Sequence, residues 1–196
     1  MGVEKECLSE DEIKSVIRAA SILGEETRRI ILILLYTGMH ISVLCNPQKV
    51  KKEHKRTGSP YHDYGLKIVK ERKKKYFQWK RPKKTGKDAI VKLLVVDEID
   101  FSDDLSNFIN KLKRRKRKSN RVYYWRLIKK VGKVAGMPKI SSMTLRHTFG
   151  LILADKGFPE SFIIQKMNCS RENLQRYLKY STKRSDDLMD RLWKPK

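Results

Sequence analysis

The feature that most constrains the fold is a run of six aliphatic residues, Ile-Ile-Leu-Ile-Leu-Leu, at positions 30–35. It follows a charged start at Glu25 and is closed by the pair Thr37-Gly38. A helix that is apolar nearly all round has no face for water, so it belongs at the centre of a domain. The run is also much shorter than the roughly 18 to 20 apolar residues that a membrane-spanning helix needs. We therefore predict a buried central helix over Glu25–Tyr36.

Helical periodicity continues along most of the chain. The segment Ser9-Glu10-Asp11-Glu12 has the spacing of a capping box, and apolar residues recur behind it at helical intervals. The same spacing, with Gly and Pro at the flanks, predicts further helices over residues 102–118, 121–134, 142–155 and 159–167, and two short ones over 172–180 and 186–193.

A different pattern occupies the middle of the chain. Short runs rich in β-branched and aromatic residues at 66–69, 76–79 and 90–96 predict three strands, and a Lys-Thr-Gly-Lys turn before the last run favours antiparallel pairing. Residues 48–65 show no periodicity and are expected to form a mobile loop. The expected fold class is therefore mainly α with a small antiparallel β-sheet (α+β), in a single domain over residues 1–196.

The balance of charge points to a polyanionic partner. The chain carries 46 Lys and Arg against 22 Asp and Glu, a formal net charge of +24. A membrane surface is the least expected polyanion, because no apolar run is long enough and the first residues lack the pattern of a signal peptide. The three cysteines are far apart and have neither disulfide-framework nor zinc-site spacing. We expect an intracellular protein, cytoplasmic or nucleoid-associated, with no metal site and no membrane partner.

The positive charge is concentrated in two clusters that also contain aromatic residues. Residues 67–87 hold eleven Lys or Arg and one acid, and residues 111–133 hold twelve and no acid. Solvated lysine-rich faces are the ordinary alternative, but this excess favours duplex DNA, with salt-dependent binding. Charge alone does not separate DNA from RNA. The residues expected to contact DNA are Lys73, Lys74, Lys75, Lys80, Arg81, Lys83, Lys87, Arg114, Arg115, Arg117 and Arg121, together with His147 and Arg176.

Two short motifs lie roughly a hundred residues apart. Residues 34–44 read Leu-Leu-Tyr-Thr-Gly-Met-His-Ile-Ser-Val-Leu, and residues 143–149 read Met-Thr-Leu-Arg-His-Thr-Phe. The first resembles the box around the first catalytic arginine of tyrosine recombinases (the phage integrase family), which usually reads Thr-Gly-Leu-Arg-Ile-Ser-Glu-Leu. The second resembles that family's His-x-Leu-Arg-His-Thr-Phe box. Here His40 stands at the first arginine position, Met143 replaces the leading histidine, and Arg146 matches the second arginine.

The resemblance extends to the rest of the catalytic set. Lys84, in the Lys-Lys-Thr-Gly-Lys turn, matches the catalytic lysine that the family carries on a β-hairpin. Tyr177, 31 residues after Arg146, suits the nucleophilic tyrosine, and Tyr180 is a competing candidate. The family's third histidine or tryptophan falls in the segment Met167-Asn168-Cys169-Ser170, where neither Asn168 nor Cys169 is the usual residue. Each match alone is weak, but their order and spacing over residues 8–181 are specific.

The resemblance implies a tyrosine recombinase catalytic-domain-like fold and a cofactor-free reaction. A tyrosine oxygen attacks a backbone phosphate, which gives a phosphotyrosyl link and a free 5′ hydroxyl. Positioned cations meet the developing charge, and a general acid protonates the leaving oxygen. By that division Tyr177 is the nucleophile, Arg146 a phosphate clamp, Lys84 the acid, and His40 an imperfect replacement for the first arginine.

Each of these residues also has a structural alternative. His40 would then cap a short helix that starts at Ile41, and Lys84 would be an ordinary turn lysine, as would Lys87. Tyr177 would pack beside its leucine neighbours. Arg146 lies on an apolar helix, where burial without a partner would be costly, so phosphate contact is favoured. Two further substitutions are interpreted structurally, Met143 as a core residue and Cys169 as a small buried apolar residue.

Two hypotheses about function remain open. The first is a DNA strand transferase of reduced activity, serving DNA recombination and integration in a mobile element. The second is a catalytically inactive, recombinase-derived DNA-binding module, or an accessory to an active recombinase. An RNA-binding protein is a weaker third, because no RNA-recognition motif is evident. The resemblance also implies assembly as a tetramer on DNA, with a C-terminal tail at 182–196 exchanged between subunits. We find no N-terminal core-binding domain in the sequence.

Overall fold

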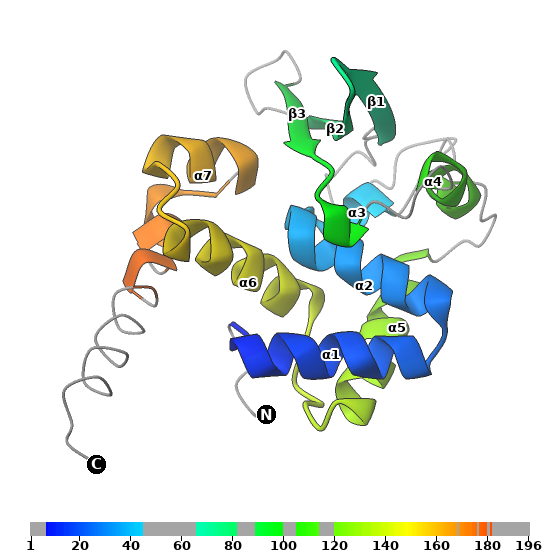
Figure 1. Ribbon diagram of the computed structural model, residues 1–196. Coiled ribbons are helices and arrows are strands. Elements are labelled where there is room, and N and C mark those ends of the chain that lie inside the picture. The colour runs from blue at the N-terminus through cyan, green and yellow to red at the C-terminus, as the bar shows by residue number, and fades with distance from the viewer. Residues whose placement is uncertain are drawn as a thin grey trace, which may run out of the picture.

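The computed structural model places helices around one small sheet (Figure 1). It describes residues 7–44, 66–81, 89–99, 105–113, 120–167, 169–175, 177–179 and 181. The sheet lies at the top of the view in Figure 1, and helices α6 and α7 lie to its left and below. The predicted class, mainly α with a small antiparallel sheet, is confirmed.

The first helix, α1 (Glu10–Ile22), begins at the predicted capping box. The amide of Glu12 donates to Oγ of Ser9 at 3.4 Å, and Oε2 of Glu12 accepts from the amide of Ser9 at 2.8 Å. These two bonds satisfy backbone donors that have no partner inside the helix. The residue before the cap is fixed as well, because the amide of Leu8 donates to Oγ1 of Thr148 in helix α6 at 3.0 Å.

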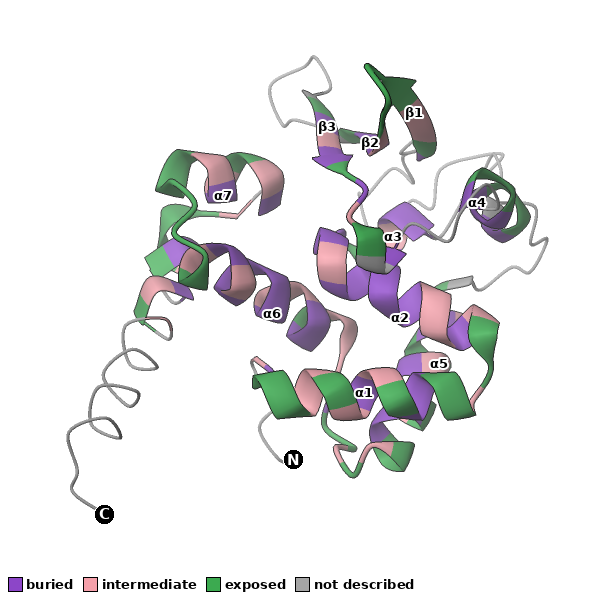
Figure 2. Ribbon diagram, in the orientation of Figure 1, coloured by how far each residue is buried: buried purple, intermediate pink, exposed green. Residues whose placement is uncertain are grey.

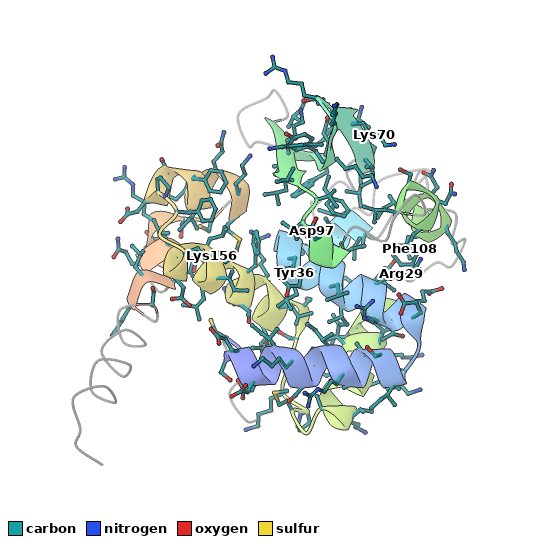
Figure 3. All side chains as sticks on the ribbon, in the orientation of Figure 1. Arg29, Tyr36, Lys70, Asp97, Phe108 and Lys156 are labelled. Carbon is teal, nitrogen blue, oxygen red and sulfur yellow. The ribbon has the colours of Figure 1, made fainter. Side chains whose placement is uncertain are left out.

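Helix α2 (Glu25–Thr37) is the central element, as the aliphatic run predicts. All six residues at 30–35 are buried, and the helix contacts α1, α6 and the 3-10 helix η1 (Asp97–Ile99). Figure 2 shows this burial as a mostly purple ribbon in the middle of the molecule. The charged N-terminal part reaches the surface, where the guanidinium of Arg29 lies 5.6 Å from the ring centre of Phe108 in helix α4 (Figure 3).

The end of α2 requires glycine. Gly38 has φ +54°, a left-handed conformation that glycine adopts without steric cost. A Cβ at this position would also lie 2.4 Å from the ring of Phe149, so the backbone here approaches helix α6 closely. The short helix α3 (Ile41–Leu44) follows after two residues.

Strands β1 (Lys67–Glu71), β2 (Lys74–Arg81) and β3 (Ala89–Leu94) form an antiparallel sheet in the order β1-β2-β3. Alternate residues turn toward the core, so Phe77 and Trp79 of β2 are buried while their neighbours are more accessible. The β1–β2 turn has two residues, both at positive φ, which is the geometry of a tight hairpin.

The remaining helices are α4 (Leu105–Lys113), α5 (Asn120–Val134), α6 (Ser142–Asp155) and α7 (Glu160–Met167), and residues 171–175 and 177–179 are also helical. All lie within or beside the predicted ranges. The predicted mobile loop at 48–65, the predicted helix at 186–193 and the tail at 182–196 lie outside the described residues. None of the described helices is long and apolar enough to cross a membrane.

The interpretation of Met143 as a core residue is wrong. Its relative exposure is 38 %, whereas the next two residues, Thr144 and Leu145, are at 1 % and 0 %. Met143 is the second residue of α6, where no preceding turn covers it, and it lies outside the buried stripe that Thr144, Leu145 and Phe149 form.

Candidate active site on helix α6

Arg146 joins three segments that are distant in the sequence. Its Nη1 donates to the carbonyl oxygen of Gly38 at 2.7 Å, and its Nη2 donates to the carbonyl oxygen of Met167. The first contact spans 108 residues and ties the end of α2 to α6, and the second ties the end of α7 to α6. These bonds offset the cost of half-burying a guanidinium and hold it in one orientation. The two sequence boxes therefore meet at Arg146.

His40 lies two residues after Gly38, at the start of α3. Its Nδ1 is 2.6 Å from Oγ of Ser42 and accepts from the amide of Ser42 at 3.3 Å. His40 therefore caps the start of α3, because its imidazole accepts a hydrogen bond from a backbone amide in the first turn of that helix.

The surroundings of His40 disfavour its protonated form. The residue is exposed overall, but neighbouring protein removes part of the water around the imidazole, and this desolvation is the main cause that lowers its pKa below the ordinary 6.5. The positive charges of Arg146 and Arg121 lower the pKa of His40 further. Arg121 belongs to the first turn of α5, which packs against α3. Positive charge from α5 and α6 thus converges on His40.

Tyr177 also lies against α6. Its hydroxyl oxygen lies 2.8 Å from Nδ1 of His147, the residue after Arg146, and the two ring centres are 5.6 Å apart. The relative exposure of Tyr177 is only 2 %. The ring fits against Gly150, where a Cβ would lie 2.7 Å from Cε2 of Tyr177. His147 and Gly150 are three residues apart and so share one face of the helix.

The other predicted site residues that the structure describes lie on the sheet and on α5. Lys73 is in the exposed β1–β2 turn, Lys74, Lys75 and Lys80 lie along β2, and Arg121 is exposed at the start of α5. The backbone of Arg81 ends β2, but its side chain is outside the described part of the chain. Residues outside the description altogether are Lys83, Lys84, Lys87, Arg114, Arg115, Arg117, Asn168, Arg176 and Tyr180. Cys169 is partly buried against the core.

Sequence reasoning did not find the junction between α7 and the sheet. Nζ of Lys166 donates to the carbonyl oxygen of Lys92 in β3 at 2.7 Å. Partial burial, and secondarily the charge of Lys92, lowers the pKa of Lys166. Lys92 in turn pairs with Glu71 of β1, and its ammonium group is 4.7 Å from the ring centre of Tyr76. Single lysines on separate elements give no sequence signal for such a contact.

The contact between His147 and Tyr177 was also missed, although one signal was present. A glycine inside a helix costs about 1 kcal/mol relative to alanine and needs a packing reason. Gly150 is such a glycine, one turn after Arg146, and its packing partner is the ring of Tyr177.

Comparison with known proteins identifies relatives over nearly the whole chain. The tyrosine recombinase XerA of Pyrococcus horikoshii is 28 % identical over 187 residues, which cover 90 % of this chain and 57 % of the relative. The XerA protein of Pyrococcus furiosus is 26 % identical over 194 residues, which cover 94 % of this chain and 60 % of the relative. The chain therefore spans less than two thirds of the length of these relatives.

Solved structures share the fold. The crystal structure of XerA recombinase superposes with a TM-score of 0.59 at 23 % identity, covering 99 % of this chain and 67 % of that one. The post-cleavage complex of XerH site-specific recombinase with palindromic difH substrate gives a TM-score of 0.59 at 15 % identity, covering 93 % and 52 %.

The model of the phage integrase family matches residues 6–184. This range contains both boxes and the tyrosine that α6 holds. The chain belongs to the phage integrase family, the tyrosine recombinases.

Proposed function

We propose that this chain binds duplex DNA and breaks and rejoins its strands through a phosphotyrosine intermediate, with Tyr177 as the nucleophile. The proposal rests on two contacts that consecutive residues of α6 make with distant parts of the chain. Arg146 is hydrogen-bonded to Gly38 of the first box, and the next residue, His147, is hydrogen-bonded to Tyr177. The cation for the phosphate and the residue that contacts the attacking hydroxyl are thus consecutive on one helix.

The reaction needs three groups besides the phosphate. The hydroxyl of Tyr177 gives up its proton to water, its oxygen forms a bond to phosphorus, and the bond from phosphorus to the 5′ oxygen breaks. Arg146 stabilises the negative charge on the non-bridging oxygens, and its carbonyl contacts orient it in advance. Lys84 protonates the leaving 5′ oxygen, a role that rests on the sequence because the residue is outside the described segments. No cofactor is required.

His40 makes the proposed activity weaker than that of a chain with arginine in its place. A neutral imidazole carries no charge to the phosphate, and the lowered pKa of His40 favours the neutral form at pH 7. Loss of one transition-state donor costs about 10²- to 10³-fold in rate. Arg121, whose charge acts on His40, supplies part of the missing positive potential.

DNA binding is supported by where the exposed charge lies. The β1–β2 hairpin presents Lys70, Lys73 and Lys74 to solvent, and Lys70 is visible on the sheet in Figure 3. Helix α5 exposes Arg121 and Arg126 beside Trp125, whose relative exposure is 56 %. Cations with an accessible aromatic ring suit phosphates and sugars. We further propose that the chain works on DNA as an oligomer, a tetramer of its own copies, or with an active recombinase.

The test is a nicked suicide DNA substrate that traps the covalent intermediate, analysed on a denaturing gel. We expect a protein–DNA adduct with the wild type and none with Tyr177→Phe, because the hydroxyl is the attacking group. Tyr180→Phe is the matched control and should keep the adduct. If Tyr180→Phe abolishes the adduct and Tyr177→Phe keeps it, the assignment of Tyr177 is wrong.

A second candidate is a DNA-binding module that does not cleave. The lowered pKa of His40 favours this second candidate, since burial and the neighbouring arginines both oppose a positive charge on the imidazole. The exposed Met143, at the position of the leading histidine, supplies no proton donor or acceptor of comparable strength. Tight duplex binding without an adduct on any suicide substrate, alone or with an active recombinase, would support this candidate and overturn the first.

A further inference from the structure

The last turn of α7 supports the proposed phosphate ligand. Nη2 of Arg146 donates to the carbonyl oxygen of Met167, which is the final residue of that helix. The last carbonyls of a helix have no partner within it, so this bond serves both the helix and the guanidinium. Because α7 has only eight residues, its end is held in place by tertiary contacts rather than by its own length. The orientation of Arg146 therefore depends on what fixes this turn.

Lys166 fixes the same turn to the sheet. Its Nζ donates to the carbonyl oxygen of Lys92 in β3 at 2.7 Å. This carbonyl lies at the free edge of the sheet, because the amide of Val95 donates to Lys75 of β2 and hydrogen-bonded positions alternate along an antiparallel pair. Lys92, three residues before Val95, thus turns its backbone groups away from β2. Lys166 supplies the donor that a further strand would otherwise supply.

The bond is not explained by a gain from the charge of Lys166. Partial burial, and secondarily the charge of Lys92, lowers the pKa of Lys166, so its ammonium group is less stable here than in water. The acceptor is a neutral carbonyl, and the carboxylate of Glu71 pairs with Lys92 instead. The ring of Phe162, whose centre is 5.3 Å from Nζ, offsets part of this cost. A lysine at this position is therefore better explained by what its bond holds in place.

The next residue, Met167, completes the junction. Met167 is 1 % exposed, and its Sδ lies against Gly38, where an added Cβ would be 2.9 Å from the sulfur. Gly38 also supplies the second carbonyl that Arg146 binds. One turn of α7 thus reaches β3 through the side chain of Lys166, Arg146 through a carbonyl oxygen, and the end of α2 through the side chain of Met167. A shift of this turn would move one of the two carbonyls that orient Arg146 relative to the other.

We propose that Lys166 is a positioning residue for strand cleavage: its bond to β3 fixes the last turn of α7 and thereby holds Arg146 in the orientation that the phosphate requires. Lys166 acts through Arg146 and does not itself touch the DNA. The inference rests on the proposed function insofar as it treats Arg146 as the phosphate ligand. The same bond fixes Arg146 relative to the sheet, whose β1–β2 hairpin presents Lys73 and Lys74 to solvent.

The first test measures the mobility of Arg146 in the free, full-length chain by nitrogen NMR of the arginine side chains. Rotation of a guanidinium is slow when both Nη groups bind fixed carbonyls, so Arg146 should rotate more slowly than the exposed Arg126. Lys166→Met keeps an apolar side chain of similar length and removes the donor. It should speed the rotation of Arg146 by about 3- to 10-fold, the effect of one lost hydrogen bond, and leave Arg126 unchanged.

Two further variants test whether the effect is specific. Lys166→Arg retains a charged donor and should restore the slow rotation in part. Lys156→Met removes an equal charge from the exposed end of α6 (Figure 3) and should leave Arg146 unchanged. The proposal is wrong if Arg146 of the wild type rotates as fast as Arg126, or if Lys166→Met leaves Arg146 as slow as before. The wild-type comparison remains decisive even where a variant unfolds.

The second test asks whether the loss of the bond reaches the reaction. On the nicked suicide substrate at saturating DNA, Lys166→Met should lower the rate of adduct formation by about 10-fold, because Arg146 is no longer held in place. The urea midpoint should stay as in the wild type, because a loosened helix end opens locally without unfolding the domain. The log–log slope of affinity against salt should also stay, whereas loss of a phosphate contact would reduce it by about 0.9.

Two results of this second test would overturn the positioning role. A lower salt slope with an unchanged rate would show that Lys166 is a DNA contact. A rate loss that only accompanies a lower urea midpoint would show that Lys166 serves stability alone.

These outcomes are separable from those of the cleavage test. An adduct that forms equally fast in Lys166→Met and in the wild type refutes the positioning role and retains the function. A wild-type chain that forms no adduct, while Lys166→Met speeds the rotation of Arg146, refutes the function and with it the role of Lys166 in cleavage.

Discussion

The guanidinium of Arg146 donates a hydrogen bond at 2.7 Å to the carbonyl oxygen of Gly38, which precedes it by 108 residues. The contact is possible because Gly38 has no side chain at the point where α2 ends against α6. It makes one arginine both a tertiary link and a candidate phosphate ligand. The two roles are compatible, because a guanidinium has five N–H donors in a rigid plane.

Replacing Arg146 by lysine separates these roles. An ammonium keeps the charge but cannot bridge the carbonyls of Gly38 and Met167 with a planar fork. We expect Arg146→Lys to lower the free energy of unfolding by about 1 to 3 kcal/mol, the cost of a lost charged hydrogen bond, and to abolish the DNA adduct. Urea unfolding and the suicide-substrate assay measure the two effects. Arg126→Lys, on an exposed face of α5, is the control and should change neither.

His40→Arg restores the residue that the family usually has at this position. We expect the rate of adduct formation to rise by about 10²-fold, because a permanent bidentate cation replaces a mostly neutral imidazole. Single-turnover kinetics on the suicide substrate measures the rate. Ser42→Ala, which removes the hydroxyl partner of His40 without adding charge, should leave the rate within a few-fold of the wild type. An unchanged rate in His40→Arg would favour the non-cleaving module.

Much of the fold could be predicted from the sequence, since the aliphatic run, the capping box and the alternating segments are local patterns. Both family boxes were found for the same reason. Contacts between distant elements could not be predicted from local patterns. Examples are the contact of Tyr177 with His147 and that of Lys166 with Lys92. Met143 was misplaced because hydrophobic character alone does not say which way the first turn of a helix faces.

The ionisation of His40 should respond to Arg121. The positive charge of Arg121 opposes protonation of the imidazole, so removing that charge makes protonation easier. We expect Arg121→Gln to raise the pKa of His40 toward its ordinary value, without reaching it, because desolvation and Arg146 still act. An NMR titration of the histidine rings measures this shift. Arg126→Gln should leave the pKa of His40 unchanged, and an equal response to both variants would show that the effect is not specific to Arg121.

The basic hairpin should account for part of the salt dependence of DNA binding. Each phosphate contact contributes about 0.9 to the log–log slope of affinity against salt, so the double variant Lys73→Gln/Lys74→Gln should reduce the slope by up to about 1.8. Fluorescence anisotropy with a labelled duplex at several salt concentrations gives the slope. The control with equal charge change is Lys14→Gln/Arg18→Gln on α1, and an equal loss there would mean that only net charge matters.

The packing of Tyr177 on Gly150 predicts a change of sign in a double-mutant cycle. In the wild-type background, Gly150→Ala should destabilise the chain by about 1 to 3 kcal/mol, the usual cost of overpacking a core site. In a Tyr177→Ala background the ring is absent, and the same substitution should stabilise α6 by about 1 kcal/mol, the helix propensity of alanine over glycine. Urea unfolding of the four proteins measures the coupling. If Gly150→Ala has the same effect in both backgrounds, the ring does not occupy this site in solution. The opposite signs are expected because the glycine weakens α6 itself and is favoured only while the tyrosine ring lies against it.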